Sequence, residues 1–162
     1  MMIVGRYRPV LLLQYLLLCV DIFMNAFTEL LRFQNVVLLV LYVIQDFCLV
    51  FAVIIIFLLF FSTFIFQAGL VSILVSKFKV AISVTFIYFA LCLALHIWTM
   101  NLRWGDVNFY IWDNRGYHVL FAFQRIAAVF YYYFYKRTAL KLGEPHFYED
   151  SEWIHKEFER RR

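Results

Sequence analysis

The sequence predicts an all-α fold: a four-helix transmembrane bundle followed by a short cytoplasmic C-terminal amphipathic helix. Hydrophobic residues make up 65% of the 162 residues and charged residues only 16%, whereas a soluble domain carries about 25% charged residues. Four apolar runs are each long enough to cross a bilayer, which takes about 20 helical residues. We expect the spans at about 10–28, 37–66, 80–100 and 117–136, so that residues 1–142 form the bundle and residues 143–162 the tail.

The first run follows Arg6 and Arg8, and basic residues before an apolar stretch are also typical of signal peptides. Cleavage requires small residues at two positions of the site, but Met24 stands two residues before Ala26. Asp21 also interrupts the run where a signal peptide would stay apolar. We therefore favour an uncleaved first span.

The second run, Val36–Phe66, is apolar on every face, as expected for a helix in lipid and not for a soluble core helix. Apolar character continues to Val75, and one straight helix over this whole stretch would be about 60 Å long, about twice the hydrocarbon thickness. We expect a break near Gly69, after which Leu70–Val75 would lie along the membrane surface. Two registers of the span remain open: Val36–Leu59 and Phe47–Phe66.

Two further runs complete the bundle. Lys77 and Lys79 are expected to form a small basic loop before the third run. An interfacial aromatic belt is expected after the third run, made of Trp98, Trp104, Tyr110 and Trp112. The fourth run ends in the aromatic stretch Tyr131–Tyr135, followed by Lys136 and Arg137, which is typical of the headgroup level.

Basic residues near the helix ends predict the orientation. They gather in three segments: the N-terminal residues, the loop with Lys77 and Lys79, and the residues after the fourth run. Four spans place these three segments on one side of the membrane. The positive-inside rule then predicts that both termini are cytoplasmic.

The tail contains its own structural signals. Gly143 followed by Pro145 is a typical helix stop, and Asp150 is a suitable N-cap for a short helix after it. The apolar face of that helix would either rest on lipid headgroups or dock a cytosolic partner. The residues of this candidate docking tail are Phe147, Tyr148, Trp153, Ile154 and Phe158.

Ionisable side chains inside the runs cost at least about 2.5–3.5 kcal/mol in hydrocarbon on insertion scales, so they need partners. Counted along their helices, the four ionisable residues in the runs fall in the outer half of the bilayer at about one depth. We predict that Arg125 pairs with Asp46 or Asp21, so that Arg125→Leu reduces the amount of folded protein. The expected polar cluster comprises Asp21, Asn25, Gln45, Asp46, His96, Gln124 and Arg125.

An ion or proton pathway is the functional alternative for this cluster, because ionisable groups inside a membrane are candidates for function. No ring or chain of acids crosses the membrane in the sequence, and we expect the cytoplasmic halves of the runs to be apolar. A structural role is therefore favoured over conduction.

Other function classes lack their motifs. The sequence has no paired catalytic carboxylates, no H-E-x-x-H, no G-x-S-x-G and no phosphate-binding glycine loop, so we expect no enzyme activity and no cofactor. The histidines lack metal-ligand spacing, and no basic block with aromatic residues suggests nucleic-acid binding. The three cysteines, Cys19, Cys48 and Cys92, are expected to act as small apolar residues in the bundle.

Several mixed polar and aromatic strings carry more information than the apolar runs: Ile44–Asp46, Phe66–Val71, Met100–Trp104, Phe123–Arg125, Tyr133–Ala139, Leu142-Gly143 and Pro145–Tyr148. Together they resemble the transmembrane protein 138 family, small four-span proteins of ciliated eukaryotes, over nearly the whole chain. The resemblance implies a role in building the primary cilium, at the ciliary base or cilium and on vesicle or vacuole-type membranes. It also implies a link to ciliary disease of the Joubert type, and neither catalysis nor a cofactor.

Two functional interpretations follow. The leading one is a non-enzymatic scaffold or trafficking factor for ciliogenesis, whose partners are the lipid bilayer and other ciliary membrane or transition-zone proteins. The alternative is a small ion channel or transporter subunit that uses the Asp and Arg residues inside the membrane.

Overall fold

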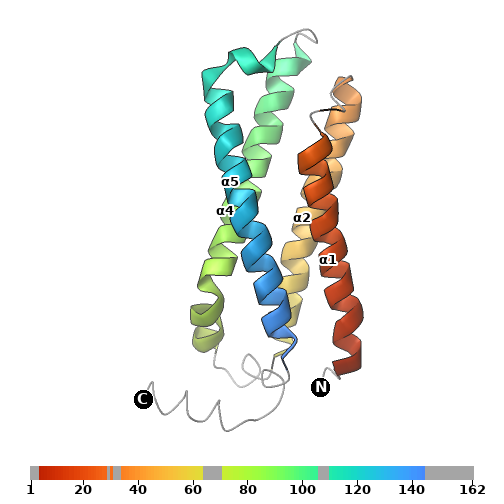
Figure 1. The fold of residues 1–162 in the computed structure, drawn as a ribbon, viewed down its shortest axis with the longest axis vertical. Coiled ribbons are helices and arrows are strands. Elements are labelled where there is room, and N and C mark those ends of the chain that lie inside the picture. Colours follow the sequence, from red (N-terminus) through yellow and green to blue (C-terminus); the bar gives the residue numbers. More distant parts are fainter. Residues whose placement is uncertain (1–3, 29, 31–33, 64–70, 106–109, 145–162) are drawn as a thin grey trace.

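The computed structural model describes residues 4–28, 30, 34–63, 71–105 and 110–144 of the chain. These residues form four long α-helices and one short 3₁₀ turn (Figure 1), and no strand occurs among them. The elements are α1 (Val4–Phe27), α2 (Asn35–Phe61), α4 (Val71–Trp104), η1 (Ile111–Asp113) and α5 (Arg115–Leu142). The all-α bundle expected from the sequence is confirmed.

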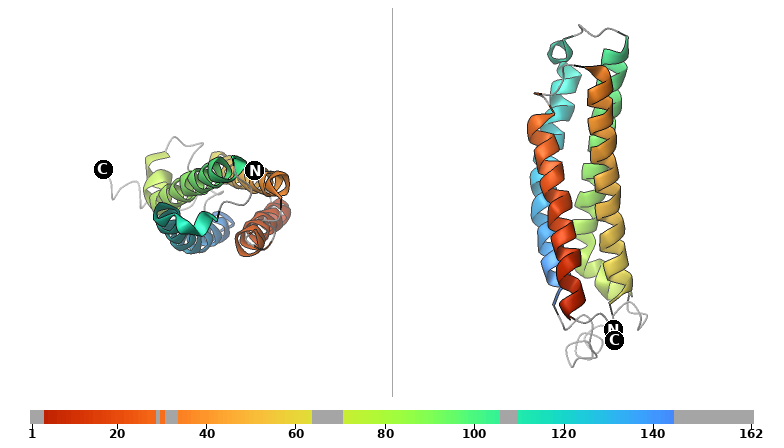
Figure 2. Two further views of the ribbon diagram at one scale, coloured as in Figure 1. Left: turned by 90° about the horizontal axis from the view of Figure 1, so that it is seen from above. Right: turned by 90° about the vertical axis from the view of Figure 1, so that its right-hand side faces the viewer.

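The helices run alternately up and down and form a ring, in which α1 lies beside α2, α2 beside α4, α4 beside α5, and α5 beside α1 (Figures 1 and 2). The start of α1 and the end of α5 therefore meet at one end of the bundle, which we call the terminal end. The Tyr7 hydroxyl donates a hydrogen bond to the Ala139 carbonyl oxygen there. Because the four helices alternate in direction, the start of α1 and the end of α5 lie at the same end of the bundle.

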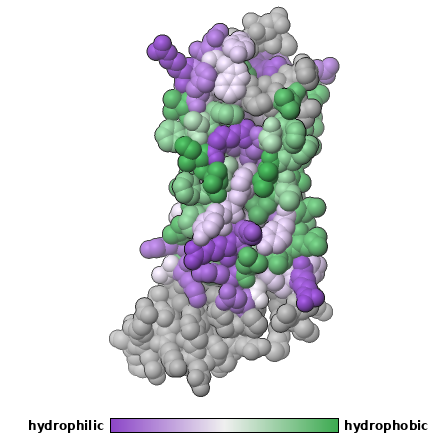
Figure 3. Space-filling view, in the orientation of Figure 1, coloured by the Kyte–Doolittle hydropathy of each residue, from purple (hydrophilic) through white to green (hydrophobic). Residues whose placement is uncertain are grey.

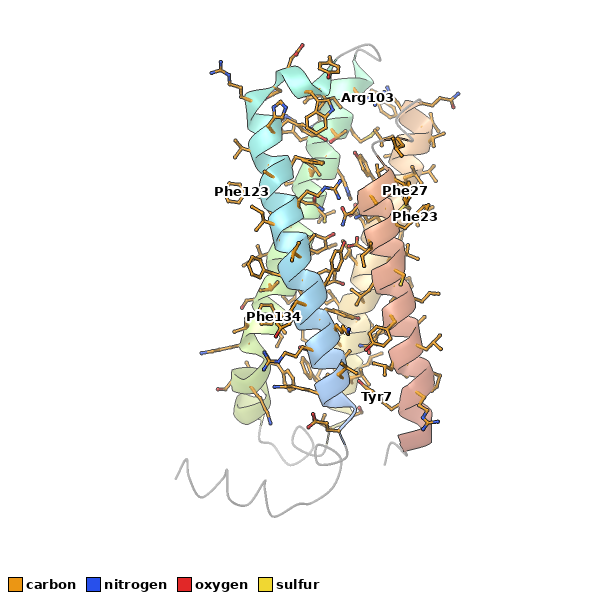
Figure 4. All side chains as sticks on the ribbon, in the orientation of Figure 1. Tyr7, Phe23, Phe27, Arg103, Phe123 and Phe134 are labelled. Atoms are coloured by element: carbon orange, nitrogen blue, oxygen red, sulfur yellow. The ribbon has the colours of Figure 1, made fainter. Side chains whose placement is uncertain are left out.

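Three stretches are long and apolar enough to cross a membrane: Tyr7–Phe27, Asn35–Phe61 and Val75–Trp104. α5 is not among them, because polar and basic residues interrupt it, but it lies along α4 through the bundle (Figure 1). Phe23, Phe27 and Phe123 point away from the bundle (Figure 4) and are all exposed. Figure 3 shows hydrophobic side chains over the middle of one face, with hydrophilic ones toward both ends. This pattern is that of a protein whose solvent is lipid.

α2 ends earlier than the span of 37–66 expected from the sequence. Its last residue is Phe61, where the polar residues begin. The Ser62 hydroxyl donates to the Leu59 carbonyl at 2.8 Å, and the Thr63 hydroxyl donates to the Phe60 carbonyl at 2.7 Å. The backbone amides of Ser62 and Thr63 bond to the same two carbonyls at 3.2 and 3.1 Å, which is the tighter pattern that closes a last helical turn. Residues 64–66 lie outside the described residues.

α4 differs from expectation at its start. Residues 71–75 are not a separate surface segment, and Lys77 and Lys79 are not in a loop, because all of them belong to this one helix. No glycine or proline interrupts residues 71–104. A helix of 34 residues is about 50 Å long, which exceeds the hydrocarbon thickness of about 30 Å. The lysines therefore lie where the helix projects toward the headgroups. The expected break at Gly69 lies outside the described residues.

Aromatic rings fill the interior toward the terminal end. The Tyr88 and Tyr131 rings stack with centroids 4.6 Å apart, and the Tyr135 ring follows 5.3 Å from Tyr131. The Tyr135 hydroxyl donates to the Ala52 carbonyl at 3.0 Å. At the opposite end, the Asn114 side chain caps α5 by accepting the Gly116 backbone amide at 3.0 Å.

Candidate functional site

The Asp21 carboxylate is the centre of a buried polar network and is only 1% exposed. Its Oδ1 atom accepts a hydrogen bond from Gln45 of α2 at 2.7 Å. Its Oδ2 atom accepts one from Tyr88 of α4 and one from Tyr132 of α5, both at 2.6 Å. One side chain of α1 is therefore bonded to each of the other three helices.

Asn25, one turn after Asp21, completes the network. Its side-chain amide lies 2.7 Å from the Tyr88 hydroxyl oxygen and 2.6 Å from the Tyr132 hydroxyl oxygen. An amide has two hydrogens, so each tyrosine accepts one from Asn25 and gives its own hydrogen to Asp21. The Asn25 carbonyl oxygen accepts from the Gln124 amide at 3.0 Å. The geometry is that of a closed cycle of donors and acceptors.

Gln124 extends the network to one more residue. Its amide also lies 3.4 Å from the Cys92 sulfur, while its carbonyl oxygen has no hydrogen-bond partner in the described part of the chain. We define the polar network by its seven members: Asp21, Asn25, Gln45, Tyr88, Cys92, Gln124 and Tyr132. Buried side chains that satisfy one another in this way fix which helix faces meet.

Asp46 and His96 form a second, smaller pair beside the network. The His96 Nδ1 atom lies 2.9 Å from the Asp46 carboxylate. The imidazole ring also stacks on the Tyr42 ring, with centroids 4.0 Å apart. The pair joins α2 to α4, and it gives Asp46 a partner other than the one expected from the sequence.

The predicted ion pair of Arg125 is not present. Among the described residues, Asp21 is bonded to neutral donors and Asp46 to His96, and Arg125 makes no ion pair with either. The Arg125 guanidinium instead lies over the Phe121 ring, 4.6 Å from its centroid, which is a cation–π contact. The prediction failed because Asp21 is satisfied by tyrosine and amide donors and Asp46 by His96, so neither acid needs the guanidinium.

Arg125 lines an open groove of about 530 Å³ between α1 and α5. Asn25 and Tyr132 of the polar network lie in the same groove, together with apolar residues such as Ile22 and Val129. A hydrophilic patch interrupts the hydrophobic face at this seam (Figure 3). The network thus reaches the membrane-facing surface on one side only of the described bundle.

Sequence reasoning missed Tyr88, Tyr132 and Gln14, and it treated Cys92 as a small apolar residue only. Tyr88 and Tyr132 were not predicted as members of the network, because tyrosine in a membrane sequence is typical of the interface. Its hydroxyl can equally donate a hydrogen bond to a buried carboxylate. Gln14 lies in the half of the first run that was expected to be apolar. It is fully buried, and neither its amide nitrogen nor its oxygen has a hydrogen-bond partner among the described residues. Its polar type was the signal that could have revealed it.

The remaining candidate residues lie elsewhere. The docking tail, with Phe147, Tyr148, Trp153, Ile154 and Phe158, falls outside the described residues. Cys19 is exposed, Cys48 half-buried and Cys92 buried, and all three are free thiols. Within the described ranges, no group of three or more His, Cys, Asp and Glu side chains is arranged to hold a metal ion.

The fold and the network define the class of the protein: a multi-pass α-helical membrane protein whose helices meet around one buried polar layer. A family model described as Transmembrane protein 138 matches residues 38–157. The chain belongs to the transmembrane protein 138 family.

Curated relatives cover nearly the whole chain. It is 56% identical to Transmembrane protein 138 of Mus musculus over 154 residues, which are 95% of this chain and 94% of the relative. Identity is 51% over 156 residues to the Xenopus tropicalis protein (96% of each chain). It is 50% over 158 residues to the Danio rerio protein (98% of this chain and 97% of the relative). No solved structure matches the chain.

Proposed function

We propose that the protein is a non-enzymatic scaffold or trafficking factor in cilium assembly. It would act at the ciliary base or cilium and on vesicle or vacuole-type membranes, with both termini cytoplasmic. Its partners would be other ciliary membrane or transition-zone proteins, contacted through lateral helix surfaces and through the tail at residues 147–162. Family membership supports the membrane setting of this proposal, and the ciliary setting is what the resemblance to the family implies.

The closed polar network is the observation that supports a scaffold over an ion-conducting protein. Asp21 accepts hydrogen bonds from Gln45, Tyr88 and Tyr132, and these donors hold it in place. Toward the terminal end, stacked tyrosine rings and aliphatic side chains occupy the interior. A conducting path needs polar groups that exchange partners along the whole membrane. The described interior is instead built to hold four helices in one arrangement.

The experiment compares two variants in ciliated cells that lack the protein. Under the scaffold proposal, deletion of residues 147–162 abolishes rescue of cilium assembly, while Asp46→Asn retains it. The full chain reconstituted into vesicles shows no ion flux above that of empty vesicles. Proximity labelling from the C-terminus would report partners and, through the identity of the labelled proteins, the side of the membrane.

A channel or transporter subunit is the second candidate. One observation favours it: Arg125 lies in a groove that exposes Asn25 and Tyr132 of the polar network to the membrane side. Ion flux in reconstituted vesicles that is lost in Asp46→Asn, together with rescue by the tail-less protein, would support this candidate and exclude the scaffold proposal.

A further inference from the structure

We propose that a basic groove between α4 and α5, at the terminal end, binds the headgroup of an anionic phospholipid that carries a phosphate monoester. The basic groove is lined by Lys77 of α4 and by Arg137 and Lys141 of α5, and it encloses about 170 Å³. No acid lines it within the described chain. The site is separate from the polar network and does not depend on a ciliary role.

The three cations converge from two helices that the fold holds side by side. Lys77 and Arg137 are exposed, and Lys141 is half-buried. Lysine and arginine are the usual ligands of phosphate oxygens, and basic pockets between transmembrane helices bind lipid headgroups. A phosphate monoester carries about −1.5 to −2 charges at neutral pH. Such a headgroup matches a basic site that contains Arg137 and Lys141 better than the single phosphodiester of a zwitterionic lipid does.

A threonine hydroxyl adds a neutral donor to the basic groove. Thr138 lines it and is only 3% exposed. A hydroxyl is a hydrogen-bond donor, so the one of Thr138 can donate to a phosphate oxygen seated among the cations.

The basic groove is charged at its outer edge and apolar further into the bundle, as a lipid is charged at its headgroup and apolar along its chains. Lys77 and Lys141 lie at its outer edge, near the ends of their helices. Val80 of α4 lines it about 5 Å further into the bundle than Lys77, and Phe134 of α5 about 10 Å further in than Lys141. Figure 4 shows Phe134 at the junction of the two helices, and Figure 3 shows hydrophilic side chains gathered over their lower ends. A headgroup at the cations would thus place its acyl chains against apolar walls.

The test measures binding of a fluorescent short-chain phosphatidylinositol bisphosphate to the full-length protein in neutral detergent micelles. Unlabelled phosphatidylinositol bisphosphate should displace the probe, whereas phosphatidylcholine should not. The soluble inositol phosphate headgroup and inorganic phosphate should compete at least about tenfold less well, because they lack the apolar contacts. Equal competition by the soluble headgroup would mean a free-phosphate site and would overturn the lipid assignment, as would displacement by phosphatidylcholine.

Matched charge variants distinguish binding in the basic groove from nonspecific attraction of the anionic lipid to a basic surface. The pair Arg137→Gln and Lys141→Gln removes two cations from the groove, and the pair Lys79→Gln and Lys136→Gln removes two from the same helices at the same level outside its lining. The first pair should weaken binding about thirtyfold and the second less than about threefold. Equal losses in the two pairs would refute a built site.

Thr138→Val provides a variant that keeps the charge. The substitution preserves shape and removes only the hydroxyl, so the protein should elute and melt as the wild type does. Binding of the probe should weaken by about threefold to tenfold, the range expected for one neutral hydrogen bond. Unchanged binding in a folded Thr138→Val protein would exclude the hydroxyl from the site.

Discussion

Replacement of Asp21 by alanine should be among the most damaging changes in the membrane-spanning part of the protein. It removes the acceptor of three short hydrogen bonds, from Gln45 at 2.7 Å and from Tyr88 and Tyr132 at 2.6 Å each. Hydrogen bonds between transmembrane helices are worth about 0.6 kcal/mol on average and up to about 1.7 kcal/mol. Three of them therefore predict a loss of about 2–5 kcal/mol in the free energy of unfolding.

Asp21→Asn gives a graded comparison. The asparagine oxygen can still accept from Gln45, but its amide faces two tyrosine hydroxyls that need an acceptor. We expect a loss of about 1–3.5 kcal/mol, because two of the three bonds are affected. The order of stability should be wild type, then Asp21→Asn, then Asp21→Ala.

Equilibrium unfolding by sodium dodecyl sulfate in mixed micelles, followed by tryptophan fluorescence, would measure these differences. Asp113→Ala is the matched control, because Asp113 is exposed in η1 and surface substitutions usually change stability by less than about 0.5 kcal/mol. If Asp21→Ala were no more destabilising than Asp113→Ala, the network would not hold the helices together and the reasoning would be refuted.

Three further substitutions test other parts of the bundle by thermal unfolding in detergent. Gln14→Met should stabilise the protein by about 1–3 kcal/mol, because the buried amide has no partner among the described residues and a methionine of similar shape needs none. Gly143→Ala should destabilise it by about 1–3 kcal/mol, because a β-carbon there would lie 2.5 Å from the Tyr7 ring. Arg125→Leu should leave stability unchanged within about 0.5 kcal/mol, because no ion pair is lost.

Each of these has its own control or contrary outcome. Gly105→Ala is the partner of the Gly143 change, because a β-carbon at Gly105 meets nothing within 4 Å, and equal effects at the two glycines would contradict the close approach of Tyr7. A lower melting temperature in Gln14→Met would mean that the amide is satisfied. A large loss of stability in Arg125→Leu would indicate that Arg125 does form the ion pair predicted from the sequence.

The sequence indicated the helices and the polar layer well, because both depend on residue type and spacing. Four members of the network, Asp21, Asn25, Gln45 and Gln124, were expected in one polar cluster, and the structure brings them together. Their donors were harder to foresee. Charges suggest partners of opposite charge, but a carboxylate in a membrane can equally be satisfied by the neutral donors Tyr88 and Tyr132, and residue type alone does not favour them.

The ends of the helices were the second feature that the sequence predicted poorly. A lysine in an apolar sequence suggests a loop, and Lys77 and Lys79 were therefore expected to lie in one. A helix much longer than the bilayer carries such residues without a break, as α4 does. Length beyond the membrane depends on how neighbouring helices support the projecting turns. Packing of this kind, as in the contact of Phe78 with Phe60 at a centroid distance of 5.4 Å, is not encoded in local pattern.

The arrangement around Asp21 has a consequence for biogenesis. The ribosome makes this aspartate 111 residues before it makes Tyr132, the last of its three hydrogen-bond donors from other helices. During that interval Gln45 and Tyr88 are made first, and until all three donors are present the Asp21 carboxylate lacks part of its hydrogen bonds, which disfavours the first helix in bulk lipid. The polar network is therefore complete only after the fourth helix has joined the bundle. Chains that stall before that helix would remain recognisable to membrane quality control.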